Sequence, residues 1–437
     1  MKLPRFYHSI CFSQALLLTA LAARADDWPQ WRGSNRDGVW TEKDVLQSFP
    51  ESGLEVRWRV PVGGGLSSPV VKGGRVYITD SKIEKPKAWE RVQCFDEKNG
   101  QLIWTHQYEV KYYDWAFDPK SPTGPGSTPI VKDGKVFTLG AAGDLFCLDA
   151  LNGAVLWKRN TSEEFELGEL SGCTPSPLIE GDLLILIVGG KPDAGVVAFD
   201  RNSGKEVWRA LSDTWSYSSP IVITAGRHRQ LIVWTPQAVT SLDPATGKTW
   251  WRHPVATQGD YAIATPVLRG DRLLVSGLMF QLDQDKPAAT VLWPDTPALS
   301  RRILSRTSIP LLQDGYVYSD KSSGRLVCLE EETGKQVWET DNLTDHKSGS
   351  SIQLTPNGDS VVLYTNEGNL IRARLTAKGF EELSRVHLID PTYLLAGRNV
   401  AWPPPAFANR CVLVRNDREL ICASLADSLS DATHPTP

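Results

Sequence analysis

Three features of the 437-residue sequence predict an all-β ring of repeated, four-stranded antiparallel units. The first is a phrase that recurs five times, in which an acidic residue is followed after four positions by Gly and after eight by Trp. The second is the composition, because 16 Trp, 35 Gly and 29 Pro against 2 Met indicate many turns and many large, rigid side chains. The third is a succession of short, β-branched-rich runs between turn residues, which predicts strands.

The composition also excludes several classes of protein. A formal net charge of −4, 41% hydrophobic residues and 22% charged residues are ordinary for a soluble, packed chain. They exclude a disordered chain, which would lack apolar surface to bury. The slightly acidic balance gives no electrostatic footprint for nucleic acid, so we expect no nucleic-acid partner. The one long apolar stretch is N-terminal, which excludes a polytopic membrane protein.

Residues 1–25 have the three parts of a secretory signal peptide. Basic residues near Met1 precede an apolar run from Ile10 to Ala23, and the segment ends in Ala-Arg-Ala. The run is shorter than the ~20 residues that span a bilayer, although an uncleaved membrane anchor is the alternative. We therefore expect an exported protein, periplasmic or secreted, with no transmembrane segment once the signal is cleaved.

Each copy of the repeated phrase belongs to a larger unit. The copies occupy residues 96–104, 149–157, 200–208, 243–251 and 330–338, and they end at Trp104, Trp157, Trp208, Trp251 and Trp338. Each unit opens with a small residue and Pro, continues with two β-rich runs, and closes with the phrase. Four short strands without helical periodicity predict a blade of a β-propeller. We predict eight blades, opening near Ser68, Thr128, Ser176, Ser219, Thr265, Ile309, Ile352 and Pro404.

The ends of the repeat region predict how the ring closes. The fifth blade has Trp293-Pro294 in place of the Gly–Trp ending, the seventh is degenerate, and the eighth has no fourth strand of its own. Residues 54–60, around Trp58, resemble a fourth strand with no blade before it. We predict that this N-terminal strand completes the last blade, because an open ring would expose strand edges. The predicted organisation is a signal peptide at 1–25, a Trp/Arg-rich segment at 26–53, a propeller at 54–427 and a flexible tail at 428–437.

The residue types of the phrase have structural reasons. Asp and Asn side chains bond to nearby backbone in turns, and Gly accepts a positive φ. A Trp side chain can bury roughly 200 Å², which is worth several kcal/mol at ~25 cal/mol per Å². A Trp at one repeated position is therefore predicted to hold blades together rather than to bind a ligand.

The phrase resembles the tryptophan-docking motif of the pyrroloquinoline quinone (PQQ) repeat family. That family includes eight-bladed quinoprotein alcohol dehydrogenases and the propeller scaffold of outer-membrane barrel assembly. The stretch from Asp27 to Gly38, which begins Asp-Trp-Pro-Gln-Trp-Arg-Gly, also resembles the start of exported propellers with PQQ-like repeats. The resemblance covers most of residues 54–425 and implies the fold, whereas the repeat motif itself is structural and leaves the activity open.

The sequence assigns no catalytic or metal-binding residue. The resemblance implies that quinoprotein dehydrogenases hold PQQ between a Trp and a disulfide of adjacent cysteines, with Ca²⁺ and an Asp base. This chain has no adjacent cysteines, no Cys-x-x-Cys-His haem motif and no Asp-x-Asp-x-Asp-Gly calcium loop. Residues 63–65 are three glycines without the Lys and helix of a phosphate-binding loop. No cofactor is predicted, and PQQ with Ca²⁺ enters only under the alternative function below.

The cysteines are predicted to be mainly structural. Cys94, Cys147, Cys328 and Cys422 share one third-strand position, where a small buried side chain is expected. Cys411 and Cys422 flank a hairpin whose expected centre lies between Asn416 and Asp417, which would place them opposite each other. A disulfide there and a pair of free thiols are both left open.

Aromatic loops before the blade openings are the candidate binding regions. Trp and Tyr beside Asp on loops favour a sugar, a peptide or a quinone, and the alternative is that these side chains plug the channel and pack the loops. The candidates are Tyr113, Asp114, Trp115, Asp118, Asp213, Trp215, Tyr217, Tyr261 and Trp402. Trp28, Trp31, Arg32 and Arg36 are expected to lie across one face of the ring.

Two functions follow from these observations. The first is an exported, non-catalytic propeller, monomeric, that binds a protein or polymer partner or acts as a scaffold. The second is a PQQ-dependent oxidoreductase with a divergent site. The first is favoured because strong repeat motifs occur without a catalytic constellation.

Overall fold

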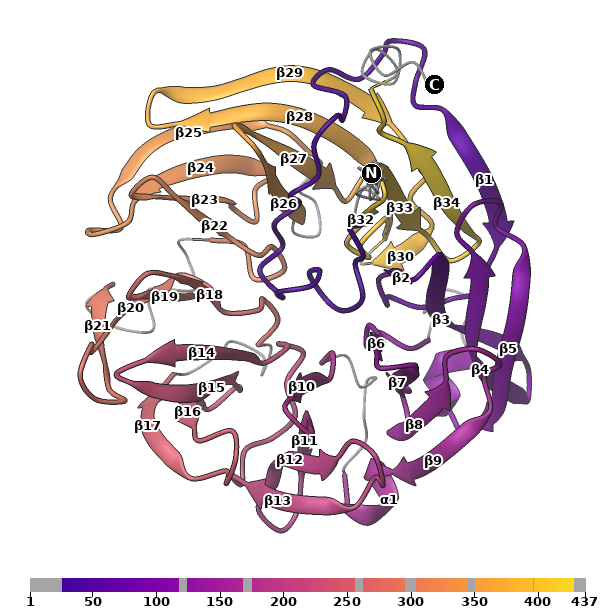
Figure 1. Cartoon of the computed structure of the whole chain (residues 1–437). Coiled ribbons are helices and arrows are strands. Elements are labelled where there is room, and N and C mark those ends of the chain that lie inside the picture. The colour runs from indigo at the N-terminus through magenta and orange to yellow at the C-terminus, as the bar shows by residue number, and fades with distance from the viewer. Residues whose placement is uncertain are drawn as a thin grey trace, which may run out of the picture.

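The computed structural model describes residues 26–117, 124–167, 175–255, 262–294, 304–344, 350–395 and 397–427. The predicted signal peptide, the predicted C-terminal tail and Cys173 lie outside these ranges. Within them, the strands form eight four-stranded antiparallel sheets and one two-stranded hairpin. The sheets are arranged as the blades of a ring, which confirms the predicted eight-bladed β-propeller (Figure 1). None of the helices in these ranges is long and apolar enough to cross a membrane.

Four blades lie in the N-terminal half of the ring, each ordered from the inner strand to the outer one. Blade 1 is β2 (Val70–Lys72), β3 (Arg75–Glu84), β4 (Lys87–Asp96) and β5 (Leu102–Val110). Blade 2 is β6 (Ile130–Lys132), β7 (Lys135–Leu139), β8 (Asp144–Asp149) and β9 (Val155–Asn160). Blade 3 is β10 (Leu178–Glu180), β11 (Leu183–Gly190), β12 (Ala194–Asp200) and β13 (Glu206–Ala210). Blade 4 is β14 (Ile221–Ala225), β15 (His228–Trp234), β16 (Ala238–Leu242) and β17 (Thr249–Pro254).

The C-terminal half holds the other four blades. Blade 5 is β18 (Val267–Arg269), β19 (Arg272–Val275), β20 (Leu278–Leu282) and β21 (Ala289–Trp293). Blade 6 is β22 (Leu311–Gln313), β23 (Tyr316–Asp320), β24 (Arg325–Glu330) and β25 (Gln336–Asn342). Blade 7 is β26 (Ile352–Asn357), β27 (Ser360–Thr365), β28 (Asn369–Thr376) and β29 (Gly379–His387). Blade 8 is β32 (Ala406–Ala408), β33 (Cys411–Arg415), β34 (Glu419–Ser424) and β1 (Val56–Pro61).

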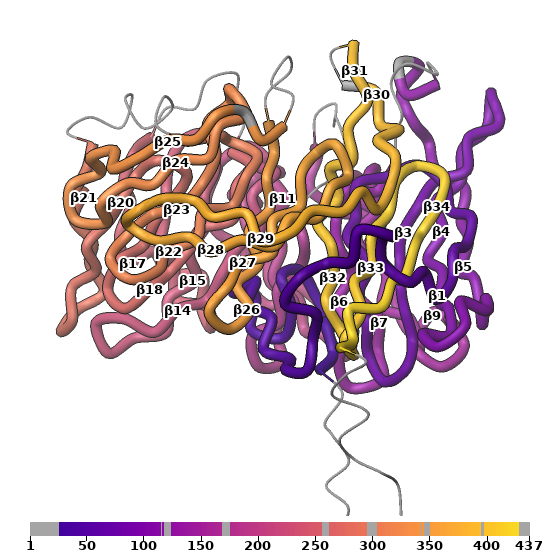
Figure 2. The backbone as a smooth tube through the Cα atoms, turned by 90° about the horizontal axis from the view of Figure 1, so that it is seen from above, coloured from indigo at the N-terminus to yellow at the C-terminus, as the bar shows by residue number. Residues whose placement is uncertain are grey.

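The alternation of strand direction gives the ring two different faces. One face, the turn face, carries the tight turns between first and second strands and the Asp…Gly turns between third and fourth strands. The other, the loop face, carries the connections from each outer strand to the next inner strand. These connections include the 3₁₀ turn η1 (Asp114–Phe117), the short α1 (Thr161–Glu164) and the hairpin β30 (Tyr393–Leu395) with β31 (Arg398–Val400). Figure 2 shows this hairpin rising from one side of the ring.

In five of the eight blades a Trp packs on a glycine of the next blade. The indole of Trp104 lies so close to Gly153 that a Cβ at this position would be 2.6 Å from the ring. Four further pairs repeat this contact: Trp58 with Gly100, Trp157 with Gly204, Trp208 with Gly247, and Trp293 with Gly334. All five glycines have φ between 68° and 75°. Glycine is therefore required at this position for two reasons: the left-handed backbone conformation of the turn and the close approach of the indole.

A hydrogen bond accompanies each of these contacts. The indole N–H of Trp104 donates to the carbonyl oxygen of Ala150, the residue that follows the turn Asp149, at 3.2 Å. Trp58, Trp157, Trp208 and Trp293 donate in the same way to Glu97, Arg201, Pro244 and Glu331. These contacts confirm the predicted packing role for Trp104, Trp157 and Trp208. They also show that Trp293 occupies the same position, so the fifth blade keeps its indole. Of the other two Trp residues of the phrase, Trp251 donates to the side chain of Gln230 in its own blade, and Trp338 donates to the carbonyl oxygen of Thr376 in blade 7.

The small residues at the third-strand position lie opposite these indoles. Cys94 pairs with Trp104, Cys147 with Trp157 and Ala198 with Trp208 in the strand register. Cys328 and Cys422 pair with Trp338 and Trp58. A side chain larger than Cys, Ala or Ser is accommodated here only in blade 5, where the flexible Met279 faces Trp293. The predicted structural role of the four cysteines agrees with this register.

The N-terminal strand closes the ring as predicted. β1 pairs antiparallel with β34, and Trp58 faces Cys422. Because the indole of Trp58 then packs on Gly100 of blade 1, the last blade is linked to the first by the same contact that joins the other blades. In Figure 1 the first and last parts of the chain meet at this seam.

Residues 40–49 of the N-terminal segment fill the junction between blades 7 and 8. Trp40 is almost fully buried and stacks on Phe407 of β32, with ring centroids 5.0 Å apart. The backbone N–H of Phe49 donates to the hydroxyl of Ser384 at 2.8 Å. Ser384 faces Arg372 in the register, which is the position of the missing Trp in blade 7. Trp40 and Phe49 belong to the same buried cluster as the strands of blade 8, so this segment supplies the apolar contact that blade 7 lacks.

Residues 28–38 cross the turn face at the channel mouth. Trp28 forms a bridge with Val71 of blade 1, and the indole N–H of Trp31 donates to Thr265 at the start of blade 5, at 2.9 Å. Arg36 donates to the carbonyl oxygens of Pro177 and Pro220. The segment thus bonds to inner strands on opposite sides of the ring, as expected for the residues across one face.

The opening Ser and Thr residues join neighbouring blades around the channel. The backbone N–H of Ser68 donates to the hydroxyl of Thr128, that of Thr128 to Ser176, and that of Ser176 to Ser219, at 2.9–3.1 Å. A bond of the opposite direction joins blades 7 and 6, where the backbone N–H of Ile352 donates to the hydroxyl of Ser308. Because a Pro follows and offers no N–H, these hydroxyls complete the hydrogen bonding of the buried inner ring.

We predict that Trp58→Ala lowers the free energy of unfolding by about 3–5 kcal/mol, because it removes a buried aromatic side chain at the only seam joining the two ends of the described ring. Chemical denaturation followed by circular dichroism measures the change. Val207→Ala is the matched control, since Val207 is exposed on an outer strand beside Trp208. Equal stability of the two variants would contradict closure through Trp58.

Candidate functional site

The loop-face mouth of the channel holds most of the described candidate residues. Trp215 and Tyr217 belong to the connection from blade 3 to blade 4, and their rings meet edge to face with centroids 4.8 Å apart. Trp402 belongs to the connection from blade 7 to blade 8 and stacks on Tyr393 of β30, at 6.2 Å. We call these four residues the aromatic mouth.

The two pairs of the aromatic mouth, Trp215 with Tyr217 and Tyr393 with Trp402, lie near each other. Burial, with Asp417 and Tyr217 nearby, raises the pKa of Tyr393 to about 12. Tyr217 thus contributes to the raised pKa of Tyr393, although the two residues belong to connections on opposite sides of the ring. The indole N–H of Trp402 is buried and has no hydrogen-bond partner. The mouth is therefore an aromatic surface with one unused donor.

Asp213, another candidate, lies beneath this surface in a buried ion pair. Its two carboxylate oxygens accept from Arg252 at 3.0 Å each, and the hydroxyl of Thr235 also donates to it. The side chain is 7% exposed. This geometry fits an anchor for the loop that carries Trp215 rather than a group that meets a ligand.

The candidates of the blade 1 to blade 2 connection lie farther along the loop face. Tyr113 and Asp114 are exposed at the start of η1. Asp118 and Tyr261 lie outside the described residues, and Trp115 is described by its backbone alone. The structure therefore brings together Trp215, Tyr217 and Trp402 and leaves Tyr113 with Asp114 as a separate exposed group.

A buried carboxylate that sequence patterns did not single out lies next to these residues. Glu90 of β4 accepts hydrogen bonds from the hydroxyls of Tyr108 and Tyr112 and from the backbone N–H of Ala141. Burial raises the pKa of Glu90 above its ordinary value, and the tyrosine hydrogen bonds act in the opposite direction. All its partners are structural, so it holds the edges of blades 1 and 2 together.

Asp320 is the second group that sequence patterns missed. It ends β23 in blade 6, is fully buried, and accepts from the hydroxyl of Ser350, while its Oδ1 has no partner. Burial raises its pKa to about 7. A break in the repeat could have identified Asp320, because apolar residues, Leu139 and Ile187, occupy the equivalent register position in blades 2 and 3.

Residues 63–65 form a structural loop, as predicted, and their N–H groups meet carboxylates. The N–H of Gly63 donates to Asp80, and that of Gly65 donates to Asp417. The buried Arg415 donates to the carbonyl oxygens of Thr79 and Gly63. These bonds fasten blade 8 to blade 1 on the loop face, opposite the N-terminal segment.

The predicted pairing of Cys411 with Cys422 is wrong by two residues. Cys411 faces Ser424, and Cys422 faces Leu413, so the two cysteines are diagonal neighbours with free, buried thiols. The cause is the turn: the side-chain oxygen of Asn416 accepts from the backbone of Arg418 and Glu419, which moves the hairpin centre one residue on. Cys422 hydrogen-bonds Cys411, and this bond lowers the pKa of the Cys411 thiol.

The described residues do not assemble the donor set that the PQQ family implies. No group of three or more His, Cys, Asp or Glu side chains able to hold a metal ion occurs among them. The diagonal thiols of Cys411 and Cys422 lie within blade 8 against Trp58, where they cannot stack on a cofactor in the channel. Asp320 is the one described carboxylate near the inner ring that has both an unpartnered oxygen and a pKa near neutrality.

Comparisons with known proteins place the repeats in a family. The family profile described as outer membrane protein assembly factor BamB matches residues 39–192, 88–338 and 283–379. The chain therefore belongs to this family of PQQ-type repeat propellers, as the repeated phrase suggested.

The relatives include proteins of different function. The chain is 27% identical over 232 residues to the tetrathionate hydrolase of Acidithiobacillus ferrooxidans, covering 49% of this chain and 42% of that protein. It is 26% identical over 214 residues to the quinohemoprotein alcohol dehydrogenase of Comamonas testosteroni, covering 46% of this chain and 28% of that protein. It is 28% identical over 127 residues to BamB of Yersinia pestis, covering 28% and 30%. The matched stretches span less than half the length of each relative.

Solved structures share the fold. The crystal structure of BamB from Moraxella catarrhalis superposes with a TM-score of 0.56 at 17% identity, covering 85% of this chain and 97% of that one. The quinohemoprotein alcohol dehydrogenase from Comamonas testosteroni superposes with a TM-score of 0.65 at 16% identity, covering 96% and 82%. At these identities the likeness concerns the propeller alone.

We predict that Asp320 makes the stability of the protein fall between about pH 4 and pH 7. Its folded pKa lies above the ordinary value of 3.8, so the folded state holds the proton more tightly than the unfolded chain. The stabilisation is complete below about pH 4 and is lost as the pH rises through about 7, with a slope of about 1.4 kcal/mol per pH unit.

Asp320→Asn should flatten this pH dependence, because the amide carries no charge to bury. Thermal unfolding midpoints at pH 5, 6, 7 and 8 give the comparison. Glu51→Gln, at an exposed carboxylate, should follow the parent chain. If the unfolding midpoints of the parent and the Asp320→Asn variant changed in parallel with pH, the raised pKa of Asp320 would be ruled out.

Proposed function

We propose that this chain is an exported β-propeller scaffold that binds a protein or polymer partner through the aromatic mouth. The observation that carries the proposal is the composition of this surface: two half-buried Trp and two Tyr side chains and the unpartnered N–H of Trp402. Trp and Tyr are the side chains that most often dominate binding interfaces. Asp213, which lies two residues before Trp215, is already neutralised by Arg252.

Two further observations support a scaffold. The chain belongs to the family described by an outer membrane protein assembly factor, a class that works by contacts with other proteins. Its predicted signal at residues 1–25 and the relatives of that family favour export to the periplasm or beyond. The described channel is narrowed on the turn face by the N-terminal segment, which leaves the loop face as the wider variable surface.

The alternative is a PQQ-dependent oxidoreductase with a divergent site. Asp320 supports it, since a buried carboxylate with a pKa of about 7 and a free oxygen is suited to act as a general base. Quinoprotein dehydrogenases among the relatives support it as well. Under this alternative Asp320 would be the group that accepts a proton.

We predict that Trp215→Ala combined with Tyr217→Ala weakens partner binding at least tenfold without unfolding the ring. The reason is the loss of two aromatic contacts, each worth of the order of 1–2 kcal/mol in an interface. Purified chain serves as bait in envelope extract; the captured partner is identified, purified and titrated by calorimetry. Leu102→Ala with Ile103→Ala, two exposed apolar residues on β5, is the matched control.

The two functions are separated by a second measurement on the same preparation. After dialysis with PQQ and Ca²⁺, a scaffold retains no quinone absorbance and reduces no dye in the presence of alcohols. Stoichiometric retention with alcohol-dependent dye reduction would support the oxidoreductase, most clearly if Asp320→Asn abolished the reduction. Unchanged partner affinity of the Trp215/Tyr217 variant would contradict binding through the aromatic mouth.

A further inference from the structure

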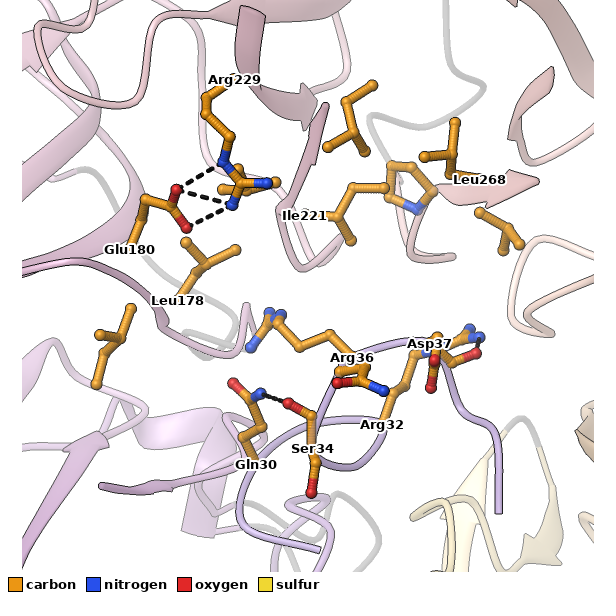
Figure 3. Close-up of a pocket in the computed structure, with 16 residues that line it drawn as sticks. Gln30, Arg32, Ser34, Arg36, Asp37, Leu178, Glu180, Ile221, Arg229 and Leu268 are labelled. Atoms are coloured by element: carbon orange, nitrogen blue, oxygen red, sulfur yellow. Dashed lines mark hydrogen bonds and ion pairs between the residues drawn. The ribbon is translucent and has the colours of Figure 1, made fainter. Parts of the chain in front are cut away.

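A cavity of about 320 Å³ lies on the turn face, between the N-terminal segment and the inner strands of blades 3, 4 and 5. Its walls on the blade side are mainly apolar and come from Leu178, Ile221 and Leu268 with their neighbours. Its other wall is the polar loop of residues 30–37 (Figure 3). The cavity is on the opposite face from the aromatic mouth, so it is independent of the proposed partner surface.

Two arginines of the loop, the buried Arg36 and the half-buried Arg32, border this cavity without a carboxylate bound to either guanidinium. Arg36 is 9% exposed and donates only to backbone carbonyl oxygens, those of Pro177, Ser176 and Pro220. Arg32 donates to the carbonyl oxygen of Asp37. The Nε–H groups of both arginines are buried and have no partner. Figure 3 shows Arg36 extending from the loop toward the strands that form the opposite wall.

The positive charge of this pair is incompletely compensated. Burial, and next the charge of Arg32, lowers the pKa of Arg36 to about 9, and burial lowers that of Arg32 to about 10 with Asp37 opposing. The remaining charged groups on the walls, Glu180 and Arg229, neutralise each other in a two-pronged ion pair at 2.8 Å. An anion in the cavity would therefore meet a net positive charge in a poorly solvated place.

The backbone indicates that these side chains are required at their positions. Arg32 and Arg36 have φ of 62° and 59°, in the left-handed region that favours glycine. A non-glycine residue there is strained, and such strain persists only where the surroundings or a function demand it. The carbonyl bonds of Arg36 account for its terminal nitrogens, whereas the Nε–H groups of both arginines are left unexplained by the fold.

We propose that this cavity is a binding site for a small aliphatic monocarboxylate. The carboxylate would lie against the uncompensated positive charge of Arg32 and Arg36, and the aliphatic chain would pack on Leu178, Ile221 and Leu268. A monoanion fits better than a phosphate because the charged side chains of the lining, three Arg against Asp37 and Glu180, leave one net positive charge. The volume is at the lower end of ligand pockets, which limits the ligand to a short chain.

Calorimetric titration of the purified chain with hexanoate, and with hexanamide as its neutral counterpart, tests the proposal. We expect hexanoate to bind at least tenfold more tightly than hexanamide, and inorganic phosphate to bind at least tenfold more weakly than hexanoate. Equal binding of acid and amide, or tighter binding of phosphate, would overturn the proposal, and so would the absence of any hexanoate binding at millimolar concentration.

Two variants locate the binding. Arg36→Met should weaken hexanoate at least tenfold, but it also removes bonds that hold the segment in place. Leu268→Phe therefore provides a second test, because it fills the half-buried apolar wall and leaves both arginines intact. It should abolish binding while the exposed control Leu151→Phe retains it. Unchanged affinity in Leu268→Phe would overturn the assignment, whatever the result for the aromatic mouth.

Discussion

The contact on which the ring depends is the packing of an indole from one blade on the glycine Cα of the next. It combines an apolar contact that only glycine permits with a hydrogen bond from the indole N–H to a turn carbonyl, as between Trp104, Gly153 and Ala150. This contact recurs at five of the eight blade interfaces, so stability is distributed around the ring. The chain can then vary its loops without loss of the ring.

The N-terminal segment compensates at blade 7, which has no Trp to make this contact. Blade 7 has Ser384 where other blades have Trp, and a buried Arg372 where they have Cys or Ala. Arg372 donates to Gln47 and Asn357, and Trp40 with Phe49 supplies the apolar surface. The same segment then crosses the turn face and provides Arg32 and Arg36. One stretch of chain therefore seals the weakest junction and forms one wall of the turn-face cavity.

The fold was predictable because its signals are local and repeated. The spacing of Asp, Gly and Trp is set by one turn and one short strand, and the unpaired strand around Trp58 had only one unpaired edge to join. The candidate site was predictable only in part: the aromatic loops were identified, but the pairing of Tyr393 with Trp402 depends on a hairpin that has no repeat.

The residues that sequence analysis missed depend on contacts between distant parts of the chain. Asp320 is unusual only because the fold buries it beside Ser350, which lies 30 residues away. Arg36 is held in position by backbone carbonyl oxygens of two blades that lie more than 140 residues away in the sequence. The error at Cys411 and Cys422 came from placing the hairpin centre one residue too early, because the side chain of Asn416 accepts from Arg418 and Glu419 and fixes the turn at residues 417 and 418.

Hydrogen exchange of the native protein tests the account of ring closure most directly. If β1 is an integral strand of blade 8, the amides of Trp58 and Val60, which face β34 in the antiparallel ladder, exchange as slowly as those of β16 in blade 4. Exchange of β1 several orders of magnitude faster than β16, with β34 behaving as an unprotected edge, would contradict a ring closed by the N-terminal strand.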